Sequence, residues 1–330
     1  MIDSPPIRFV IIGAGSIGAF QSGVSGLLNH AAAICANNDS YLESFCDIDI
    51  EKAALAGKMW NCASTSCIDE ALGTNPEVIV VATPDSTHAD VLRKILACSP
   101  KIVLCEKPLT TQIEESRNLA LLYRGAGVKL LVNYQRRFDS EVIKLKNKFV
   151  QGHTGGLISG VVYYSKGILH NGSHAIDLLR FIFGEPLWFM KSSSRSDYFI
   201  DDHTVAGLIG FQTGEIAMLG CDERAFSIFE VDLIFDNLRF RYSCSGTEVA
   251  LYSVRPDPNF DGYYELLLDE VKQSGFCESM PAVISHIVQM ARFCSNEESA
   301  ISAENAVKTQ EVCQRIADSP LHCRINFEKN

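Results

Sequence analysis

Short apolar runs alternate with helical patterns through the first 133 residues, and this alternation limits the possible fold more than any other feature of the chain. The apolar runs cover residues 8–12, 41–46, 78–82, 101–105 and 129–133. The patterns between them, with apolar side chains every three or four positions, cover residues 17–35, 51–60, 91–97 and 116–123. Short strands separated by helices indicate right-handed βαβ units. We therefore predict an α/β domain with a doubly wound parallel sheet over residues 1–133.

The pattern changes at the polar, glycine-rich residues 151–156. The strand-like segments that follow cover residues 157–165, 187–194, 204–211, 215–222, 228–235 and 238–243. Helical patterns in this half cover residues 173–183, 281–294 and 303–317. A chain of 330 residues is long enough for two domains. We expect residues 134–330 to form an α+β domain with a mostly antiparallel, open sheet, and its C-terminal helix could pack back on the first domain.

Composition excludes several classes of protein. With 47% hydrophobic and 21% charged residues, the chain is typical of a soluble globular protein. Its net charge of -11 argues against a nucleic acid partner. No apolar run reaches the length of about 18 residues that a membrane span needs. No basic segment precedes the first apolar run, and we expect a cytoplasmic protein.

The twelve cysteines do not have the spacing of a metal site or a disulfide framework. The closest pair, Cys62 and Cys67, is separated by four residues, and the sequence has no CxxC motif. Most of the others lie in apolar or helical runs, where a free thiol behaves as a small hydrophobic group. We predict reduced cysteines and no metal.

The first apolar run ends in a GxGxxG motif, which suggests a dinucleotide site of the Rossmann type. The residues concerned are Gly13, Gly15, Ser16, Ile17 and Gly18. The motif is a weak signal alone, but here it lies between a strand and a helix at the start of a βαβ unit. The first glycine permits a tight turn, the second lets a pyrophosphate approach the backbone, and the third allows close packing. Backbone N–H groups at the helix start would then face the phosphates.

Asp47 ends the second strand, where a carboxylate usually bonds the adenosine ribose. It follows Gly18 by 29 residues, longer than the usual spacing of about 20, and the long first helix could absorb the difference. Asp49 is the alternative acid, and Asp47 could instead cap the next helix. No Lys or Arg follows at positions 48–50 to bind a 2′-phosphate, so the sequence favours NAD over NADP.

Longer motifs carry a resemblance to a known family. The segments are GAGSIG (13–18), VIVVATPDSTHADVL (78–92), KIVLCEKPL (101–109), NYQRRFD (133–139), HNGSHAIDLL (170–179) and ENAVKTQEVCQRIADS (304–319). In this order they resemble the glucose–fructose oxidoreductase/inositol dehydrogenase/MocA (Gfo/Idh/MocA) family over nearly the whole chain.

The resemblance implies a set of residues around the nicotinamide. Those at the end of the third parallel strand are Ala82, Thr83, Pro84 and His88. Glu106 and Lys107 would lie at the end of the next strand, in the crevice where open α/β sheets bind ligands. Pro108 would hold the turn, often in this family through a cis peptide, and would direct Lys107 to the nicotinamide. A surface lysine paired with Glu106 is the alternative.

In the second half the resemblance implies that His174 is the acid–base group. Asp177 follows one turn later on the same helical face and is a second catalytic candidate, or else a buried structural acid. Family members that act on sugars and inositol commonly have an aspartate four residues before the histidine, where this chain has His170. His170 could share the acid–base work, bind a substrate group or only line the site. Arg136 and Arg137 could meet a substrate anion, or one of them could form a structural ion pair.

These features together predict an NAD-dependent oxidoreductase that transfers hydride at a hydroxyl-bearing carbon of a sugar, polyol or nucleotide-linked sugar. His174 would exchange the hydroxyl proton, and Lys107 would polarise the C–O bond. A dinucleotide-sensing regulator without catalysis and a reductase of a non-sugar substrate are the alternatives. We also expect a homodimer or homotetramer, because an open sheet with alternating apolar residues on both faces needs a cover. These residues are Val205, Gly207, Ile209, Phe211, Val231, Leu233 and Phe235.

Overall fold

The computed structural model describes residues 5–21, 29–222, 226–293 and 298–327. The chain divides into two compact units, the first made of Met1–Gln135 with Cys277–Lys308 and the second of Arg136–Phe276 with Thr309–Asn330. The second unit therefore differs from the predicted domain, because residues 277–308 belong to the first unit. Side-chain contacts hold them there, including an ion pair of 2.8 Å between Arg292 and Asp39.

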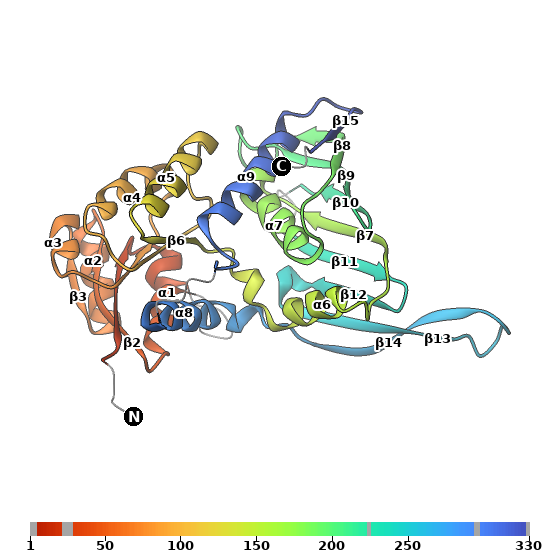
Figure 1. Ribbon diagram of the computed structural model, residues 1–330, viewed down its shortest axis with the longest axis horizontal. Helices are drawn as coiled ribbons and strands as arrows, with labels where there is room; N and C mark the ends of the chain where they lie inside the picture. The colour runs from red at the N-terminus through yellow and green to blue at the C-terminus, as the bar shows by residue number, and fades with distance from the viewer. Residues whose placement is uncertain (1–4, 22–28, 223–225, 294–297, 328–330) are drawn as a thin grey trace. The chain divides into compact units, whose positions relative to one another are not determined.

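The first unit contains a six-stranded sheet in which every strand pairing is parallel. Its strands are β1 (Ile7–Ile12), β2 (Ser40–Cys46), β3 (Ala63–Thr65), β4 (Val78–Val81), β5 (Ile102–Cys105) and β6 (Lys129–Val132). Their order, β3-β2-β1-β4-β5-β6, is that of a Rossmann fold and confirms the predicted doubly wound sheet (Figure 1). The chain reverses direction across the sheet between β1 and β4, where such folds bind ligands.

Helices flank this sheet. They are α1 (His30–Cys35), α2 (Ile50–Trp60), α3 (Ile68–Gly73), α4 (His88–Leu96), α5 (Ile113–Gly125) and α8 (Phe276–Phe293). Local chemistry sets the ends of α2: the Asp49 carboxylate accepts the N–H groups of Glu51 and Lys52, and Asn61 ends the helix in a left-handed conformation. The edge strand β6 is covered, since Val132 N–H donates to the Ile301 carbonyl at 2.8 Å.

The helix predicted over residues 17–35 is wrong as a single helix. The structure has a five-residue π-helical turn, η1 (Ser16–Phe20), and the separate helix α1. Gln21 is extended after the turn, and Asn29 is extended before α1, where its side chain accepts the Ala32 N–H and caps the helix. Residues 22–28 lie outside the described residues. Apolar spacing continued across both breaks, so periodicity alone could not detect them.

The second unit is built on a nine-stranded sheet, which is antiparallel except for the pairing of β7 with β10. Its strands are β7 (Leu157–Tyr164), β8 (Trp188–Arg195), β9 (Thr204–Phe211), β10 (Gly214–Gly220), β11 (Phe229–Phe235), β12 (Leu238–Ser243), β13 (Glu248–Pro256), β14 (Tyr264–Gln273) and β15 (Arg324–Asn326). The predicted mostly antiparallel sheet is confirmed.

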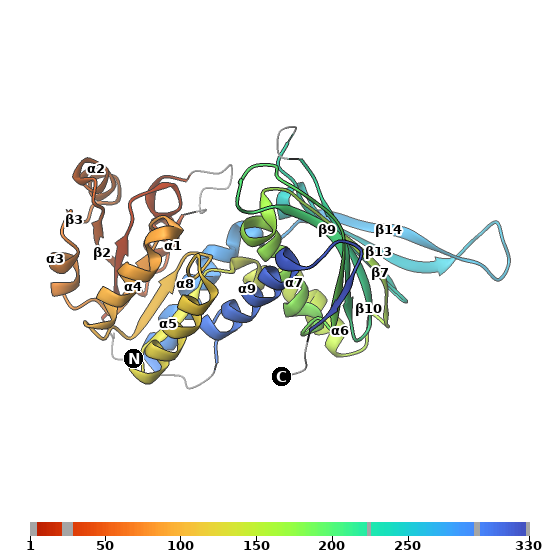
Figure 2. The same cartoon turned by 90° about the horizontal axis from the view of Figure 1, so that it is seen from above.

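One face of this sheet carries the core of the second unit. Residues from α6 (Ser140–Val150), α7 (Gly172–Phe183) and α9 (Ala303–Asp318) pack on it, as Figure 2 shows. The apolar residues that we expected to need a cover lie on this buried face. The opposite face is polar over β11 and β12, where Arg239 donates to Asp232 at 2.9 Å, and apolar over β8 to β10, where it carries Met190, Leu208 and Leu219. The residues named in the sequence analysis thus share one face, because the alternation along β11 puts Val231 and Leu233 inside and Asp232 outside. The second face is apolar in part, through other residues of the same strands.

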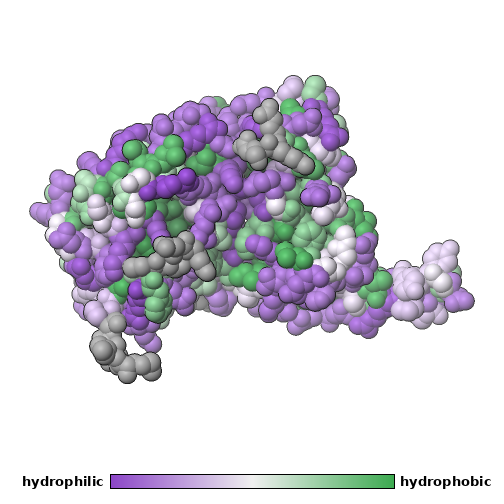
Figure 3. Space-filling model, in the orientation of Figure 1, coloured by the Kyte–Doolittle hydropathy of each residue, from purple (hydrophilic) through white to green (hydrophobic). Residues whose placement is uncertain are grey.

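The β13–β14 hairpin was not predicted, and it extends beyond the rest of the sheet (Figures 1 and 2). None of the residues 251–273, all of them described, is buried. Its most exposed large side chains are Phe260, Tyr263, Tyr264, Leu268 and Val271. The face of the molecule in Figure 3 is mainly hydrophilic, with smaller hydrophobic areas. Among the described residues no helix is both long and apolar enough to cross a membrane.

Candidate active site

The three glycines of the turn after β1 have different surroundings. Gly13 has a φ of +104°, and a Cβ there would lie 2.5 Å from the backbone of Ala82. A Cβ on Gly18 would lie 2.2 Å from the Gly13 carbonyl oxygen. A Cβ on Gly15, in contrast, would meet no atom within 4 Å. Gly13 and Gly18 thus allow the turn to close, whereas Gly15 leaves open space at its surface.

A cavity of about 650 Å³ opens beside this turn in the first unit. The residues that line it are Ile12, Gly13, Gly15, Cys46, Asp47, Ile48, Asp49, Lys52, Ser66, Ile68, Ala82, Thr83, Pro84, Thr87 and Lys94. The set joins the glycine turn to the carboxyl ends of β2 and β4. The cavity is of the size of small-molecule sites, and the residues fit a dinucleotide whose phosphates meet the turn at Gly15.

Asp47 is half-buried at the end of β2 and is oriented by the backbone. One carboxylate oxygen accepts the Ala14 N–H at 2.7 Å, and the other accepts the Asp49 N–H at 2.9 Å. Asp49, not Asp47, caps α2, so the alternative that Asp47 is the helix cap does not hold. Burial, followed by the charge of Asp47, raises the pKa of the neighbouring Cys46 thiol to about 11. The thiol is neutral at pH 7, and Asp47 supplies the negative charge at this strand end.

His88 joins the ends of β4 and β5. Its Nε2 lies 2.9 Å from the Thr83 carbonyl oxygen and its Nδ1 lies 2.9 Å from the Pro108 carbonyl oxygen. The ring is 1% exposed, so it reaches a bound molecule only through the two turns that it holds. Thr83 and Pro84 themselves line the cavity. His88 is therefore a positioning residue for the cofactor residues predicted around it.

Glu106 is the centre of a polar cluster at the end of β5. Its Oε1 accepts hydrogen bonds from His30 Nε2 at 2.8 Å and Asn133 Nδ2 at 2.7 Å, and Oε2 accepts the Lys107 N–H at 3.3 Å. The Lys107–Pro108 peptide is cis, as the resemblance implies. Lys107 is partly exposed at this turn.

The cluster keeps Glu106 ionised. Burial alone would raise the pKa of this carboxyl, but the hydrogen bonds from His30 and Asn133 and the charge of Lys107 lower it below its ordinary value. Sequence reasoning missed both His30 and Asn133. Asn133 directly follows β6, and a polar residue at that end of a parallel strand was the available signal. His30 had none, because it lay inside the expected long helix.

In the second unit the three predicted side chains, His170, His174 and Asp177, have different surroundings. His174 is half-buried and lies edge-on to the Phe229 ring, with 6.4 Å between ring centroids. Asp177 is 2% exposed and accepts two hydrogen bonds from Arg137, at 2.7 and 2.8 Å, and one from Thr309 at 2.9 Å. These contacts match the alternative of a buried structural acid, with Arg137 as its ion-pair partner.

The neighbouring Arg136 has a different environment. Its guanidinium carbon lies 4.2 Å from the centre of the Phe229 ring and 4.7 Å from that of Phe276. Burial lowers its pKa, while Tyr242 and nearby aspartates act in the opposite direction. This packing between two rings gives Arg136 a structural role in the second unit.

His170 stands where an aspartate is common in the family, and it contacts an aspartate from another segment of the chain. Its Nδ1 lies 2.8 Å from Oδ2 of Asp202, which is 4% exposed. Asp202 lies just before β9, and the sequence analysis did not identify it. Its signal was weak, since two aspartates before a strand are also common in turns.

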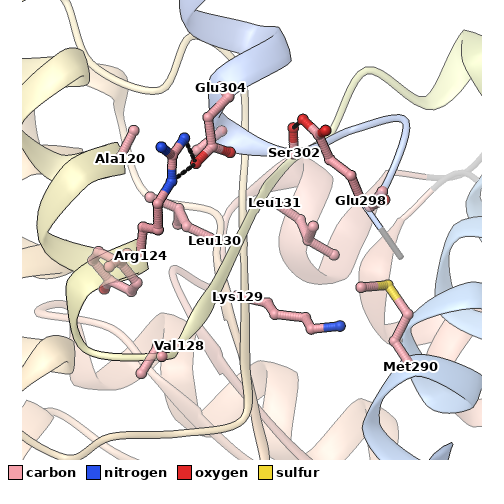
Figure 4. A pocket seen from close by; sticks show the side chains of 14 residues that line it. Ala120, Arg124, Val128, Lys129, Leu130, Leu131, Met290, Glu298, Ser302 and Glu304 are labelled. Carbon is pink, nitrogen blue, oxygen red and sulfur yellow. Dashed lines mark hydrogen bonds and ion pairs between the residues drawn. The ribbon is translucent and has the colours of Figure 1, made fainter. Parts of the chain in front are cut away.

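A second cavity of the first unit, of about 510 Å³, lies beside the edge strand β6 (Figure 4). An ion pair between Arg124 and Glu304, 2.6 Å long, lies at its side, and Met290 lines it from α8. None of its lining residues belongs to the glycine turn or to the ends of β2, β4 and β5. The 650 Å³ cavity is thus the dinucleotide candidate. Among the described residues no group of three or more metal-binding side chains comes together.

Three comparisons place the chain among known proteins. Residues 7–134 match the family model described as oxidoreductase family (Gfo/Idh/MocA), NAD-binding Rossmann fold. An inositol 2-dehydrogenase from Mycolicibacterium gilvum is 29% identical over 201 residues, which are 55% of this chain and 53% of that protein. The chain spans about half the length of the curated relatives that it matches.

Solved structures share the fold over nearly the whole chain. The WlbA dehydrogenase from Bordetella pertussis, in complex with NADH and UDP-GlcNAcA, has a TM-score of 0.78 at 17% identity and covers 100% of both chains. A 3-ketoreductase from Actinomadura kijaniata, in complex with TDP-benzene and NADP, has a TM-score of 0.76 at 15% identity and covers 94% of this chain and 97% of that one. At these identities the likeness shows the fold alone.

Proposed function

We propose that this chain, whose residues 7–134 match the Gfo/Idh/MocA family model, is a dehydrogenase or reductase acting on CH–OH groups. One observation carries the proposal: two polar turns follow paired strand ends beside the glycine turn. Val81 of β4 pairs with Cys105 of β5, so the turns that begin at Thr83 and Lys107 leave the sheet side by side. The turn itself does not require a lysine at position 107, so Lys107 is available for a role toward a ligand.

Each side chain has a defined task. NAD, when bound, supplies the hydride acceptor or donor. The residues that would hold it are Gly13, Gly15, Ser16, Ile17, Gly18, Asp47, Ala82, Thr83, Pro84 and Glu106, with His88 supporting them from behind. The Lys107 ammonium polarises the C–O bond and stabilises negative charge on oxygen. One of the two predicted histidines, His174 or His170, exchanges the hydroxyl proton, since imidazole can bind or release a proton near neutral pH.

We propose NAD, rather than NADP, as the cofactor. Asp47 and the adjacent Asp49 put two carboxylates at the ribose end of the cavity, where a 2′-phosphate would be repelled. Lys52 also lines the cavity, but it lies 3.5 Å from Asp49 and is offset by it. Titration of the protein with NADH and NADPH, followed by nucleotide fluorescence, should give at least tenfold tighter binding of NADH. Equal or tighter binding of NADPH would contradict this assignment.

The substrate class that we propose is a sugar, a polyol or a nucleotide-linked sugar. The inositol 2-dehydrogenase relatives support the polyol class. The test is a panel containing myo-inositol, aldoses, uronic acids and UDP-linked sugars, with NAD and NADP side by side and absorbance of the reduced nucleotide as the readout. Turnover with one class identifies the substrate. Tight NAD binding without turnover on any member would favour the dinucleotide-sensing regulator instead.

We also propose a cytoplasmic homodimer or homotetramer. In the described part of the chain every cysteine is a free thiol, in keeping with a reducing compartment. The β13–β14 hairpin supports assembly, because its residues 251–273 have no buried side chain and expose apolar groups such as Phe260 and Tyr264. Size-exclusion chromatography with light scattering should give a multiple of the 36.3 kDa chain mass. A single monomer peak at micromolar concentration would contradict assembly.

A further inference from the structure

His170 has a partner that its place in the chain does not reveal. It lies in the π-helical turn η4 (Gly167–Asn171), immediately before α7, and its side chain is 30% exposed. Its Nδ1 is 2.8 Å from Asp202 Oδ2, in the loop before β9. The partly exposed imidazole and the buried carboxylate thus form a histidine–aspartate pair within the second unit.

The turn is built around this carboxylate. Asp202 accepts the backbone N–H groups of Leu169 and His170, each at 2.9 Å. Gly167 has a φ of +77°, and a Cβ there would lie 2.0 Å from Asp202 Oδ2. The position of the carboxylate is therefore fixed independently of the His170 ring, and the ring must adjust to it.

Two contacts then fix the ring. Phe199 stacks on the imidazole with 3.9 Å between centroids and 15° between planes, and Asp202 Oδ2 lies 2.8 Å from Nδ1. A carboxylate is only an acceptor when ionised, so Nδ1 must carry the hydrogen of a neutral ring. Nε2 is then the basic nitrogen. Asp202 also stabilises the imidazolium that forms when Nε2 takes a proton.

We propose that Asp202 is a positioning residue that makes His170 a proton acceptor and donor at Nε2. This inference rests on the proposed oxidoreductase function. Oxidation of a carbinol removes a hydride from carbon, which the nicotinamide cofactor takes, and a proton from oxygen, which His170 Nε2 takes; reduction reverses both. His170 lies in the turn η4 and His174 in α7, and of these two imidazoles His170 is the one with Asp202 at its Nδ1.

The first test reads the ring directly and needs no substrate. Long-range ¹H–¹⁵N spectra of the full chain with ¹⁵N-labelled histidine, with His170→Asn for assignment, should show His170 protonated at Nδ1 when neutral. Asp202→Asn keeps the shape of the side chain and should give a mixed or Nε2-protonated ring. Asp197→Asn is the matched control, because Asp197 accepts the Lys166 N–H of the same turn at 2.9 Å. An unchanged His170 tautomer in Asp202→Asn would overturn the positioning role.

The second test separates proton transfer from structural support. On the substrate found in the panel, His170→Asn should lower kcat by about 10²-fold or more, and Asp202→Asn by at least about tenfold, with NADH binding unchanged. In the His170→Asn background, Asp202→Asn should add less than about threefold, because both changes remove the same function. The inference would be overturned if the kcat losses of the two single variants multiplied in the double variant. It would also be overturned if the fall in kcat of Asp202→Asn were explained by a lower thermal midpoint of unfolding.

The two proposals fail differently. If the wild-type protein turns over a panel substrate and Lys107→Met does not, while His170→Asn and Asp202→Asn remain fully active, only the Asp202–His170 inference is wrong. If the wild-type protein turns over no member of the panel, the oxidoreductase function fails and the proton-transfer role fails with it. The tautomer spectra still decide in that case whether Asp202 orients the ring.

Discussion

Gly13 and Gly15 stand two residues apart in one motif, yet the structure gives them different tasks. A Cβ at position 13 would lie 2.5 Å from the backbone of Ala82, and the residue has a positive φ, whereas position 15 is open and has a φ of −84°. Gly13→Ala should lower the free energy of unfolding by about 2 kcal/mol or more through strain. Gly15→Ala should change it by no more than about 0.5 kcal/mol and weaken NADH binding.

Urea unfolding and NADH titration of both variants check this pair. Each variant serves as the control for the other, since both add one methyl group to the same turn. Equal losses of stability would contradict the assignment of Gly13 to the fold and of Gly15 to the ligand. Tight NADH binding by Gly15→Ala would show that no phosphate approaches the backbone at this position.

Glu106 predicts a pH dependence of stability. Its pKa is lowered in the folded protein, so its contribution is present above its ordinary value of 4.5 and is lost as the pH falls through the folded value. The loss of unfolding free energy in Glu106→Gln should thus be largest near pH 7 and shrink below pH 4.5. Urea unfolding of both proteins between pH 3.5 and 7, values chosen around the ordinary pKa, measures this. A constant difference across that range would contradict the ion-paired state.

At the scale of elements, the sequence predicted best where a strand is buried on both faces. The strands β1, β4 and β5 were predictable because each is a continuous apolar run between helices. The break between η1 and α1 was not, because apolar spacing continues through Gln21 while its backbone is extended. The β13–β14 hairpin was missed for the opposite reason. Its residues 251–273 have no buried face, so they show no alternation of apolar and polar residues to detect.

The hairpin gives a prediction at this scale. Leu268 and Val271 are 53% and 51% exposed in β14, so changing both to Asp should alter the monomer's stability by no more than about 0.5 kcal/mol each. If the hairpin contributes to assembly, light scattering should show a smaller species for this double variant. The control is Asp261→Asn at the exposed tip, which should leave the mass unchanged. An unaltered mass in both would exclude the hairpin as an assembly surface.

At the scale of the whole molecule, the order of elements along the chain was predictable and the division into units was not. Residues 277–308 follow the second sheet in sequence but belong to the first unit. Their contacts, such as that of Asn37 Nδ2 with Ser285 Oγ at 3.1 Å, join positions far apart in the sequence. The same holds for the candidate site, where Asp202 and His30 reach His170 and Glu106 from remote segments. Motifs identify local turns, whereas such partners depend on tertiary packing.

Hydrogen exchange tests this division. The free energy of opening measured for the amides of α8 should equal that of the amides of β1 and β4. NADH should slow exchange in all three elements together by mass action. Amides of β9 and β11 are the internal control and should respond less. If α8 instead follows β9 and β11 and ignores NADH, its assignment to the first unit is wrong.

The central claim is that Lys107 acts on the substrate and not on the fold or the cofactor, and its replacement tests this most directly. Initial rates of NAD reduction on the panel substrate should fall by about 10² to 10³-fold in Lys107→Met, with NADH affinity within about threefold of the wild type. Lys101→Met is the matched control, because Lys101 precedes the opposite end of β5, is half-exposed and pairs with Glu77. It should keep its rate. A Lys107→Met protein that retains most of its turnover would contradict the account.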